Sequence, residues 1–143
     1  MTRLLLITLL LLSSGPAYAE WVSVSSSEDL DGYAAYLDPD TIRRKGHLVK
    51  VWGLYDFKTI QTVAGNSHLS VKIQHEYDCI EERSRSLAST FFSGSMGMGN
   101  VVRTDSYESK WEPVTPESID QDLLKVACGK KRSRIKLLTF APL

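Results

Sequence analysis

Residues 69–79 read LSVKIQHEYDC, the cleanest alternation of apolar and polar side chains in the chain. One face of a strand over this stretch carries Leu69, Val71, Ile73, His75, Tyr77 and Cys79, and the other carries Ser70, Lys72, Gln74, Glu76 and Asp78. A strand with one apolar and one polar face is typical of an antiparallel sheet that buries one side. We therefore predict such a sheet, with Cys79 on its buried face and the polar set in solvent.

Other segments in which apolar and polar residues alternate precede and follow this strand in the sequence. The predicted strands are residues 21–25, 33–37, 47–58, 83–93 and 101–104, and residues 111–114 are predicted to be extended. Within the longest of them, Gly53 indicates either a β-bulge or a close approach of another backbone. Turn-forming residues mark loops at 38–40 and 94–100, and residues 60–68 are predicted to be a flexible connection.

One amphipathic helix is predicted near the C-terminal end. It begins either with Thr115 as N-cap and Pro116 in the first turn, or with Ser118 as N-cap and Gln121 completing a capping box. An apolar stripe that includes Leu123 runs along it, and Gly129 is a typical stop. Several short strands and one helix predict an α+β domain with two layers.

The N-terminal residues predict an export signal. A basic residue, Arg3, precedes the apolar run Leu4–Leu12, and the Ala17–Ala19 segment has the small-x-small pattern of a cleavage site. Nine apolar residues are too few for a membrane span, which needs about 20. We predict that residues 1–19 are a signal peptide cleaved between Ala19 and Glu20. The mature chain is expected to have no transmembrane segment, and no lipoprotein anchor because no cysteine follows the apolar run.

The chain has two cysteines, Cys79 and Cys128, so one intramolecular pairing exists. Export favours a disulfide between them, and two buried free thiols are the alternative. The bond would close a loop of about 50 residues, which the chain-entropy model values at about 4 kcal/mol. It would also clamp the last turn of the helix to the end of the 69–79 strand.

Charge is balanced overall but unevenly distributed. The 143 residues include 17 basic and 17 acidic side chains, which suits one domain and argues against a nucleic-acid partner. Residues 20–129 hold 11 basic and 17 acidic side chains, whereas residues 130–143 hold five basic ones and no acidic one. These five are the candidate contacts for a polyanion or an acidic partner: Lys130, Lys131, Arg132, Arg134 and Lys136. A solvated tail is the alternative.

No catalytic or metal-binding motif stands out. The histidines His47, His68 and His75 lack the spacing of metal ligands, so neither a metal site nor a cofactor is expected. His75 is predicted to be a hydrogen-bonded residue of the core or of an interface. The glycine-rich segment 94–99 joins strand to strand, unlike a dinucleotide fingerprint, and there is no Gly-x-Ser-x-Gly elbow. These observations predict a protein that is not an enzyme.

A family resemblance rests on short motifs in order along residues 21–128. They are Tyr36-Leu37-Asp38-Pro39, Val51-Trp52-Gly53-Leu54-Tyr55-Asp56, Glu76-Tyr77-Asp78-Cys79, Trp111-Glu112-Pro113-Val114 and the helix ending Ala127-Cys128. With these motifs the chain resembles the surface-adhesin protein E family of Gram-negative bacteria. The resemblance implies a single antiparallel sheet of about six strands over residues 20–129, with the C-terminal helix held against one face by the disulfide. It also implies export to the periplasm or cell surface, and binding to host matrix or serum proteins, with haem as a further ligand.

Three hypotheses follow for function. The first is an exported, non-enzymatic binding protein that contacts host matrix or serum proteins, or another envelope protein. The second is a soluble periplasmic accessory protein, and the third is a carrier of a small ligand such as haem or a lipid-like molecule. Because an open sheet has two unpaired edges, we also expect self-association, for example as a homodimer.

Overall fold

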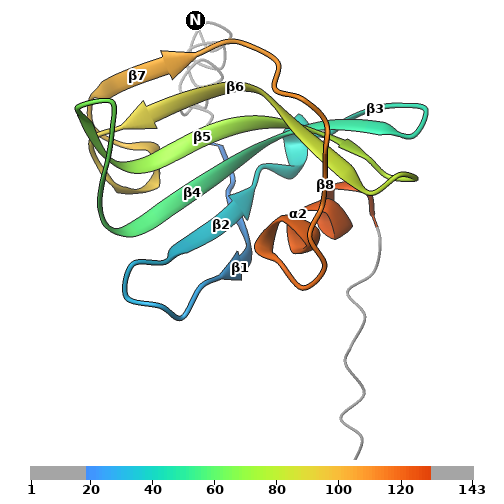
Figure 1. Cartoon of the computed structure of the whole chain (residues 1–143), viewed down its shortest axis with the longest axis horizontal. Coiled ribbons are helices and arrows are strands. Elements are labelled where there is room, and N and C mark those ends of the chain that lie inside the picture. The colour runs from blue at the N-terminus through green and yellow to red at the C-terminus, as the bar shows by residue number, and fades with distance from the viewer. Residues whose placement is uncertain (1–18, 130–143) are drawn as a thin grey trace, which may run out of the picture.

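The computed structural model describes residues 19–129 of the chain. The predicted signal peptide up to residue 18 and the basic tail, residues 130–143, lie outside the described residues, so those two predictions stay predictions. The strands are β1 (Val22–Ser26), β2 (Tyr33–Leu37), β3 (Arg43–Lys45), β4 (Leu48–Val63), β5 (Asn66–Asp78), β6 (Arg83–Phe92), β7 (Val101–Asp105) and β8 (Glu112–Pro113). Two short 3-10 helices, η1 (Pro39–Thr41) and η2 (Ser95–Gly97), and one α-helix, α2 (Ile119–Ala127), complete the described part (Figure 1).

All the strands pair antiparallel in one sheet, which confirms the predicted class. The main order is β1-β2-β4-β5-β6-β7, with β3 beside β4 and β8 beside β6. The sheet described therefore has eight strands, and the expectation of about six was wrong. The two extra strands are only three and two residues long. All three residues of β3 are charged and exposed and β8 contains Pro113, so neither has the alternation by which strands are predicted.

The helix α2 packs on one face of the sheet, which we call the inner face, against β1, β2 and β4 (Figure 1). Aliphatic side chains fill the space between the two layers: Val24, Ala35, Leu37, Val49 and Val51 of the sheet and Leu123, Leu124 and Ala127 of the helix are at most 3% exposed. The structure thus confirms the predicted helix-on-sheet core.

Ser118 is the N-cap of α2, so the second of the two predicted helix starts is right. Its hydroxyl accepts a hydrogen bond from the backbone N–H of Gln121 (3.1 Å). The Gln121 side chain accepts from the N–H of Glu117 (3.0 Å), one residue earlier than in a standard capping box. At the other end, Cys128 is the C-cap and Gly129 has a positive φ of 71°.

Cys79 and Cys128 form the predicted disulfide. The bond joins the chain just after β5 to the end of α2. A second contact lies nearby, where the Arg44 guanidinium of β3 donates to the Ala127 carbonyl oxygen (2.9 Å). Covalent and hydrogen-bonded links therefore both fix the helix C-terminus to the sheet.

The predicted flexible connection at 60–68 is wrong, because β4 and β5 form one long hairpin that turns at Ala64 and Gly65. The pairing is irregular in the middle of this hairpin. Asp56 pairs with Ser70 and Gln61 with His68, so residues 57–60 lie opposite Leu69 alone. The irregularity changes which residue faces inward. His68 is 3% exposed, whereas Leu69, which was predicted on the buried face, is half-buried.

The polar face of β5 is also covered, contrary to the prediction that it faces solvent. Glu76 accepts hydrogen bonds from Arg85 (Nη2–Oε1, 2.6 Å), and Asp78 accepts from Arg83 (3.1 Å) and from two backbone N–H groups of the following turn. Ser70 donates to the Gly94 carbonyl oxygen (2.6 Å) in the loop that folds over this end. The alternation located the two faces correctly but did not reveal that β6 side chains and the 94–100 loop cover the second face.

Gly53 keeps regular pairing with both neighbouring strands, so the predicted bulge is absent at this position. A Cβ atom there would lie 3.4 Å from the Tyr36 carbonyl oxygen and 3.5 Å from the His75 ring, which are ordinary contact distances, so the alternative of a close backbone approach is not found either.

Candidate functional site

The part of the inner face that α2 leaves uncovered contains two adjoining hollows, of about 300 and 390 Å³. They share Tyr33, Tyr55 and Ser86 as lining residues, so they form one continuous depression. We call it the aromatic groove. Its walls are Tyr33 from β2, Tyr55 and Phe57 from β4, His68 and His75 from β5 and Phe91 from β6, and its inner end is bounded by Glu112 and Asp120.

The rings of the groove form a connected series of tilted and edge-to-face contacts. Tyr33 lies 5.5 Å from both Tyr55 and Phe57, measured between ring centroids. The His68 ring stands edge-on between Phe57 (5.7 Å) and Phe91 (4.9 Å). Such contacts hold aromatic side chains in fixed orientations. The groove is therefore largely preformed, since rings from four neighbouring strands support one another.

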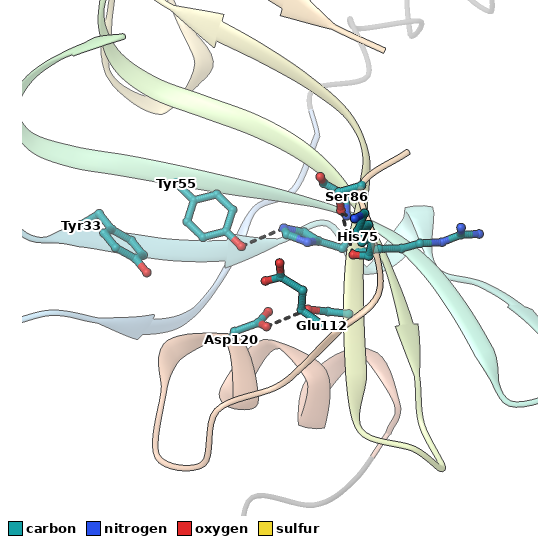
Figure 2. Close-up of a pocket in the computed structure, with 10 residues that line it drawn as sticks. Tyr33, Tyr55, His75, Ser86, Glu112 and Asp120 are labelled. Atoms are coloured by element: carbon teal, nitrogen blue, oxygen red, sulfur yellow. Dashed lines mark hydrogen bonds between the residues drawn. The ribbon is translucent and has the colours of Figure 1, made fainter. Parts of the chain in front are cut away.

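The inner end of the groove is polar (Figure 2). There the Tyr55 hydroxyl hydrogen-bonds His75 Nε2 (2.8 Å), and Asp120 accepts hydrogen bonds from the hydroxyls of Tyr77 (3.0 Å) and Ser84 (2.9 Å). The cap at Ser118 places Asp120 in the first turn of α2, where the helix dipole favours a negative charge. Figure 2 shows the Glu112 side chain from β8 reaching into the same space.

The charge of Asp120 extends across this inner end. Burial raises the pKa of Tyr33, and the carboxylate of Asp120 raises it further. Burial and then Asp120 raise the pKa of Tyr55, and burial, the neighbouring Tyr55 and then Asp120 raise that of Tyr77. Burial lowers the pKa of His75 to about 4, although Asp120 opposes this change. At neutral pH the hydroxyls are thus protonated and His75 is uncharged.

The balance of charge favours a cation at the inner end. Asp120 and Glu112 carry negative charge there, while the positive side chains that line it are Lys110 and Arg85. Arg85 is bound by Glu76 and Glu108, so its charge is already compensated. A cationic group that enters the groove would meet a carboxylate in an aromatic surrounding, a combination that stabilises organic cations.

His68 carries an unsatisfied polar atom at the outer end of the groove. Its Nδ1 is buried and has no hydrogen-bond partner among residues 19–129. Buried polar groups without a partner are uncommon in folded proteins and each costs free energy. A ligand that hydrogen-bonds this nitrogen would remove that cost.

The predicted site residues lie apart from the groove or outside the described part. Cys79 and Cys128 are bonded at the C-terminal end of α2, and the five basic tail residues follow beyond Gly129. His75 is the hydrogen-bonded buried histidine that was predicted. Residues 19–129 contain no group of three His, Cys, Asp or Glu side chains able to hold a metal ion. Nor does any helix within that range have the length and apolar character to cross a membrane.

Sequence reasoning missed the aromatic groove. Most of its rings lie on strands that were predicted, but His68 was placed in the flexible connection, and periodicity gave only the face that each ring shares. The signal that was available is one of length: the short helix predicted before Gly129 cannot cover strands as long as those predicted over 47–58 and 69–79.

Known protein structures share this architecture. The structure is similar to Haemophilus influenzae protein E in crystal form II, with a TM-score of 0.59 and 12% sequence identity over 80% of this chain and 92% of that chain. Its selenomethionine form gives a TM-score of 0.57 and 11% identity over 81% and 92% of the two chains. Protein E from non-typeable Haemophilus influenzae gives 0.55 and 12% over 80% of each. At these identities the likeness shows the fold alone.

No curated protein sequence matches the chain. A family model does match, that of surface-adhesin protein E, and it covers residues 21–129. This range includes every strand of the described sheet, the helix and both cysteines. The chain therefore belongs to the surface-adhesin protein E family.

Proposed function

We propose that this protein is an exported, non-enzymatic binding protein whose aromatic groove is its contact surface. The observation that carries the proposal is that six aromatic and histidine rings line one open depression on the face that otherwise forms the core. Family membership supports an adhesin-like role at the cell surface. Host matrix or serum proteins, or another envelope protein, are the partner classes proposed.

The groove fits a polypeptide segment that presents apolar side chains beside one lysine or arginine. The outer hollow, about 390 Å³, takes the apolar side chains against the rings of Phe57, His68 and Phe91. The cationic group then reaches the inner end near Asp120 and Glu112. Aromatic side chains are frequent contributors to protein interfaces because they bury a large area with few rotatable bonds.

The polar groups of the inner end support binding rather than catalysis. His75 Nε2 is engaged by Tyr55, and the two hydroxyls that reach Asp120 are bound to its carboxylate. With a pKa near 4, His75 holds its proton too weakly to act as a general acid at neutral pH.

Binding to immobilised matrix glycoproteins and serum proteins tests the role of the groove. In the mature chain, Tyr33→Ser with Phe57→Ser should weaken binding at least tenfold. The matched control is Leu30→Ser with Val101→Ser, because these apolar side chains are 87% and 55% exposed and do not line the groove. Equal affinities for the two double variants would contradict the proposal.

Cell location separates the proposal from the accessory-protein hypothesis. Protease treatment of intact cells should remove the protein if it is displayed on the surface, while a periplasmic marker protein is spared. If the protein is spared together with the marker, the periplasmic accessory role replaces the surface role.

A small-ligand carrier is the second candidate, favoured by the unsatisfied His68 Nδ1 in an aromatic hollow. Titration of the mature protein with haem, followed by absorption spectroscopy, tests it with one planar aromatic probe. Saturable binding that His68→Phe weakens at least tenfold would support the carrier. Binding that this variant leaves unchanged would place the ligand elsewhere.

A further inference from the structure

Three rings form one side of the inner hollow, the part of the aromatic groove with a volume of about 300 Å³. Tyr33 lies 5.5 Å from Tyr55 between ring centroids, Tyr55 lies 5.8 Å from His75, and in both pairs the ring planes are inclined by 60°. Burial lowers the pKa of His75 to about 4, so this ring is uncharged at neutral pH and does not repel a cation. The inner hollow therefore has a wall of three neutral π systems.

Two carboxylates lie across the inner hollow from these rings (Figure 2). Asp120 is held in place, because its Oδ1 atom accepts from the Tyr77 hydroxyl (3.0 Å) and its Oδ2 atom accepts from the Ser84 hydroxyl (2.9 Å). Glu112 is exposed, and its side chain reaches into the same space. A group that occupies the hollow thus lies between aromatic rings and negative charge.

The positive side chains of the lining leave this negative charge available to a ligand. Arg85 is paired with two other carboxylates, at 2.6 and 3.0 Å. Lys110 is exposed, so its ammonium group keeps its hydration. Within the range 19–129, neither side chain forms an ion pair with Asp120 or Glu112.

The hydrogen bonds already made around the inner hollow indicate which kind of cation fits best. Both Asp120 oxygens accept from hydroxyl groups, and His75 Nε2 is engaged by the Tyr55 hydroxyl (2.8 Å). A primary ammonium or guanidinium group that leaves water completely must replace several hydrogen bonds, and these buried acceptors are in use. A quaternary ammonium group has no N–H to satisfy, and its methyl groups contact aromatic rings directly.

We propose that the inner hollow is a binding site for a choline group, whose trimethylammonium end lies between the wall of three rings and the Asp120 carboxylate. This inference goes beyond the proposed function, because it assigns a small ligand to the inner hollow and needs no protein partner. It uses one end of the same groove, so choline should compete with a protein that fills the groove completely.

Titration of the mature protein with choline, followed by isothermal calorimetry, tests the site. Two probes are matched to choline. Dimethylbutanol, its carbon isostere, has the same shape without the charge, and ethanolamine has the charge on a primary ammonium. We expect choline to bind at least about tenfold more tightly than either probe. Phosphocholine is titrated in parallel: tighter binding than that of choline identifies a phosphorylated headgroup as the source, and equal or weaker binding identifies free choline.

Two pairs of variants locate the bound group. Asp120→Asn removes the charge opposite the rings and should weaken choline binding about tenfold. Its matched control, Asp122→Asn, removes the same charge from the first turn of α2 but does not line the hollow. Tyr33→Leu removes one ring and should cause a similar loss, whereas Tyr36→Leu changes a tyrosine of the same strand outside the groove. Both controls should stay within about twofold of the unaltered protein, and circular dichroism of each variant confirms that it is folded.

Three outcomes would overturn the inference. In the first, the mature protein shows no saturable binding of choline. In the second, dimethylbutanol or ethanolamine binds as tightly as choline. In the third, Asp120→Asn binds choline as the Asp122→Asn control does, which places the choline group elsewhere. None of these outcomes touches the proposed function, which is measured on matrix and serum proteins, and choline binding without protein binding would contradict the proposed function alone.

Discussion

The inner face of the sheet has two parts that share strands but differ in composition. Under α2, β4 and β5 contribute Val49, Val51 and Tyr77, each at most 1% exposed. Beyond the helix the same strands contribute Tyr55, Phe57 and His68, which line the open groove. Both parts belong to the same hairpin, although its pairing is irregular at residues 57–60 of the open part. The two parts also differ in their side chains and in whether the helix covers them.

The comparison shows how stability and recognition are divided within one sheet. The covered part is aliphatic and closed by a disulfide, as expected of a core. The open part holds aromatic rings, an unsatisfied buried nitrogen and a carboxylate, features that cost stability or add little to it. We therefore expect changes in the covered part to alter mainly stability, and changes in the open part to alter mainly binding.

Removal of the disulfide should have the largest effect on stability. The double change Cys79→Ala with Cys128→Ala releases a loop with a sequence separation of 49 residues, and should lower the free energy of unfolding by about 4 kcal/mol. Urea denaturation at pH 7 measures the loss. A loss below about 1 kcal/mol would mean that packing and the Arg44 contact suffice to hold α2 on the sheet.

Truncation in the covered core comes next. Leu123 is fully buried, so Leu123→Ala should cost about 3 kcal/mol through lost burial and a residual cavity. Leu30→Ala is the matched control, since this leucine is 87% exposed and should change stability by less than about 0.5 kcal/mol. Similar effects of both changes, in thermal or urea unfolding, would contradict the assignment of Leu123 to the core that stabilises the fold.

His75 lies at the boundary between the two parts and should make stability depend on pH. Its pKa is about 4 in the folded protein and about 6.5 in the unfolded chain, so the unfolded state binds more protons between these values. Stability is then complete above pH 6.5 and decreases as the pH falls toward 4. We expect a loss of about 2 kcal/mol between pH 7 and pH 4.5.

The control for this pH dependence is His75→Gln, which cannot titrate in that range. Urea denaturation of both proteins at several pH values should show a flatter profile for the variant. An unchanged profile would assign the loss to carboxylates instead of His75.

The smallest effect on stability is expected at His68, where the substitution should stabilise the protein instead of destabilising it. His68→Phe removes the unsatisfied Nδ1 while keeping a ring between Phe57 and Phe91, and should raise the free energy of unfolding by about 0.5–1 kcal/mol. His75→Phe should lower it, because the Tyr55 hydroxyl then loses its partner. Thermal unfolding compares the two variants, and a destabilised His68→Phe protein would show that Nδ1 is not a cost to the fold.

The sequence predicted the antiparallel sheet, the helix and the disulfide, and Ser118 was one of the two predicted N-caps. Each of these leaves a signal in the sequence itself: alternating residues, capping residues, or a single possible pair of cysteines. It did not predict β3 or the burial of Glu76 and Asp78. The charge pattern of β3 indicates a solvent-exposed loop, and the two carboxylates are buried only because Arg83 and Arg85 of the next strand meet them. Burial raises the pKa of Asp78, but the backbone N–H groups of Glu81 and Ile80 and the Arg83 side chain outweigh that effect and lower it overall.

The aromatic groove was missed for a similar reason. Periodicity shows which side chains share a face of the sheet but not where the covering helix ends, so it did not separate Phe57 and Phe91 from the core. The link between β3 and the end of α2 likewise needed the three-dimensional structure, because Arg44 and Ala127 are 83 residues apart.

The irregular pairing at residues 57–60 has a consequence for how this fold can vary. In a regular hairpin, an insertion of one residue shifts the pairing of the two strands. The side chains beyond the insertion then point to the opposite face of the sheet. Here four residues on β4 already lie opposite one on β5, so the faces of the hairpin tip are set independently of those under the helix. The tip, which forms the outer lip of the groove, is thus free to change in length and sequence among relatives while Val49, Val51 and Tyr77 keep their places.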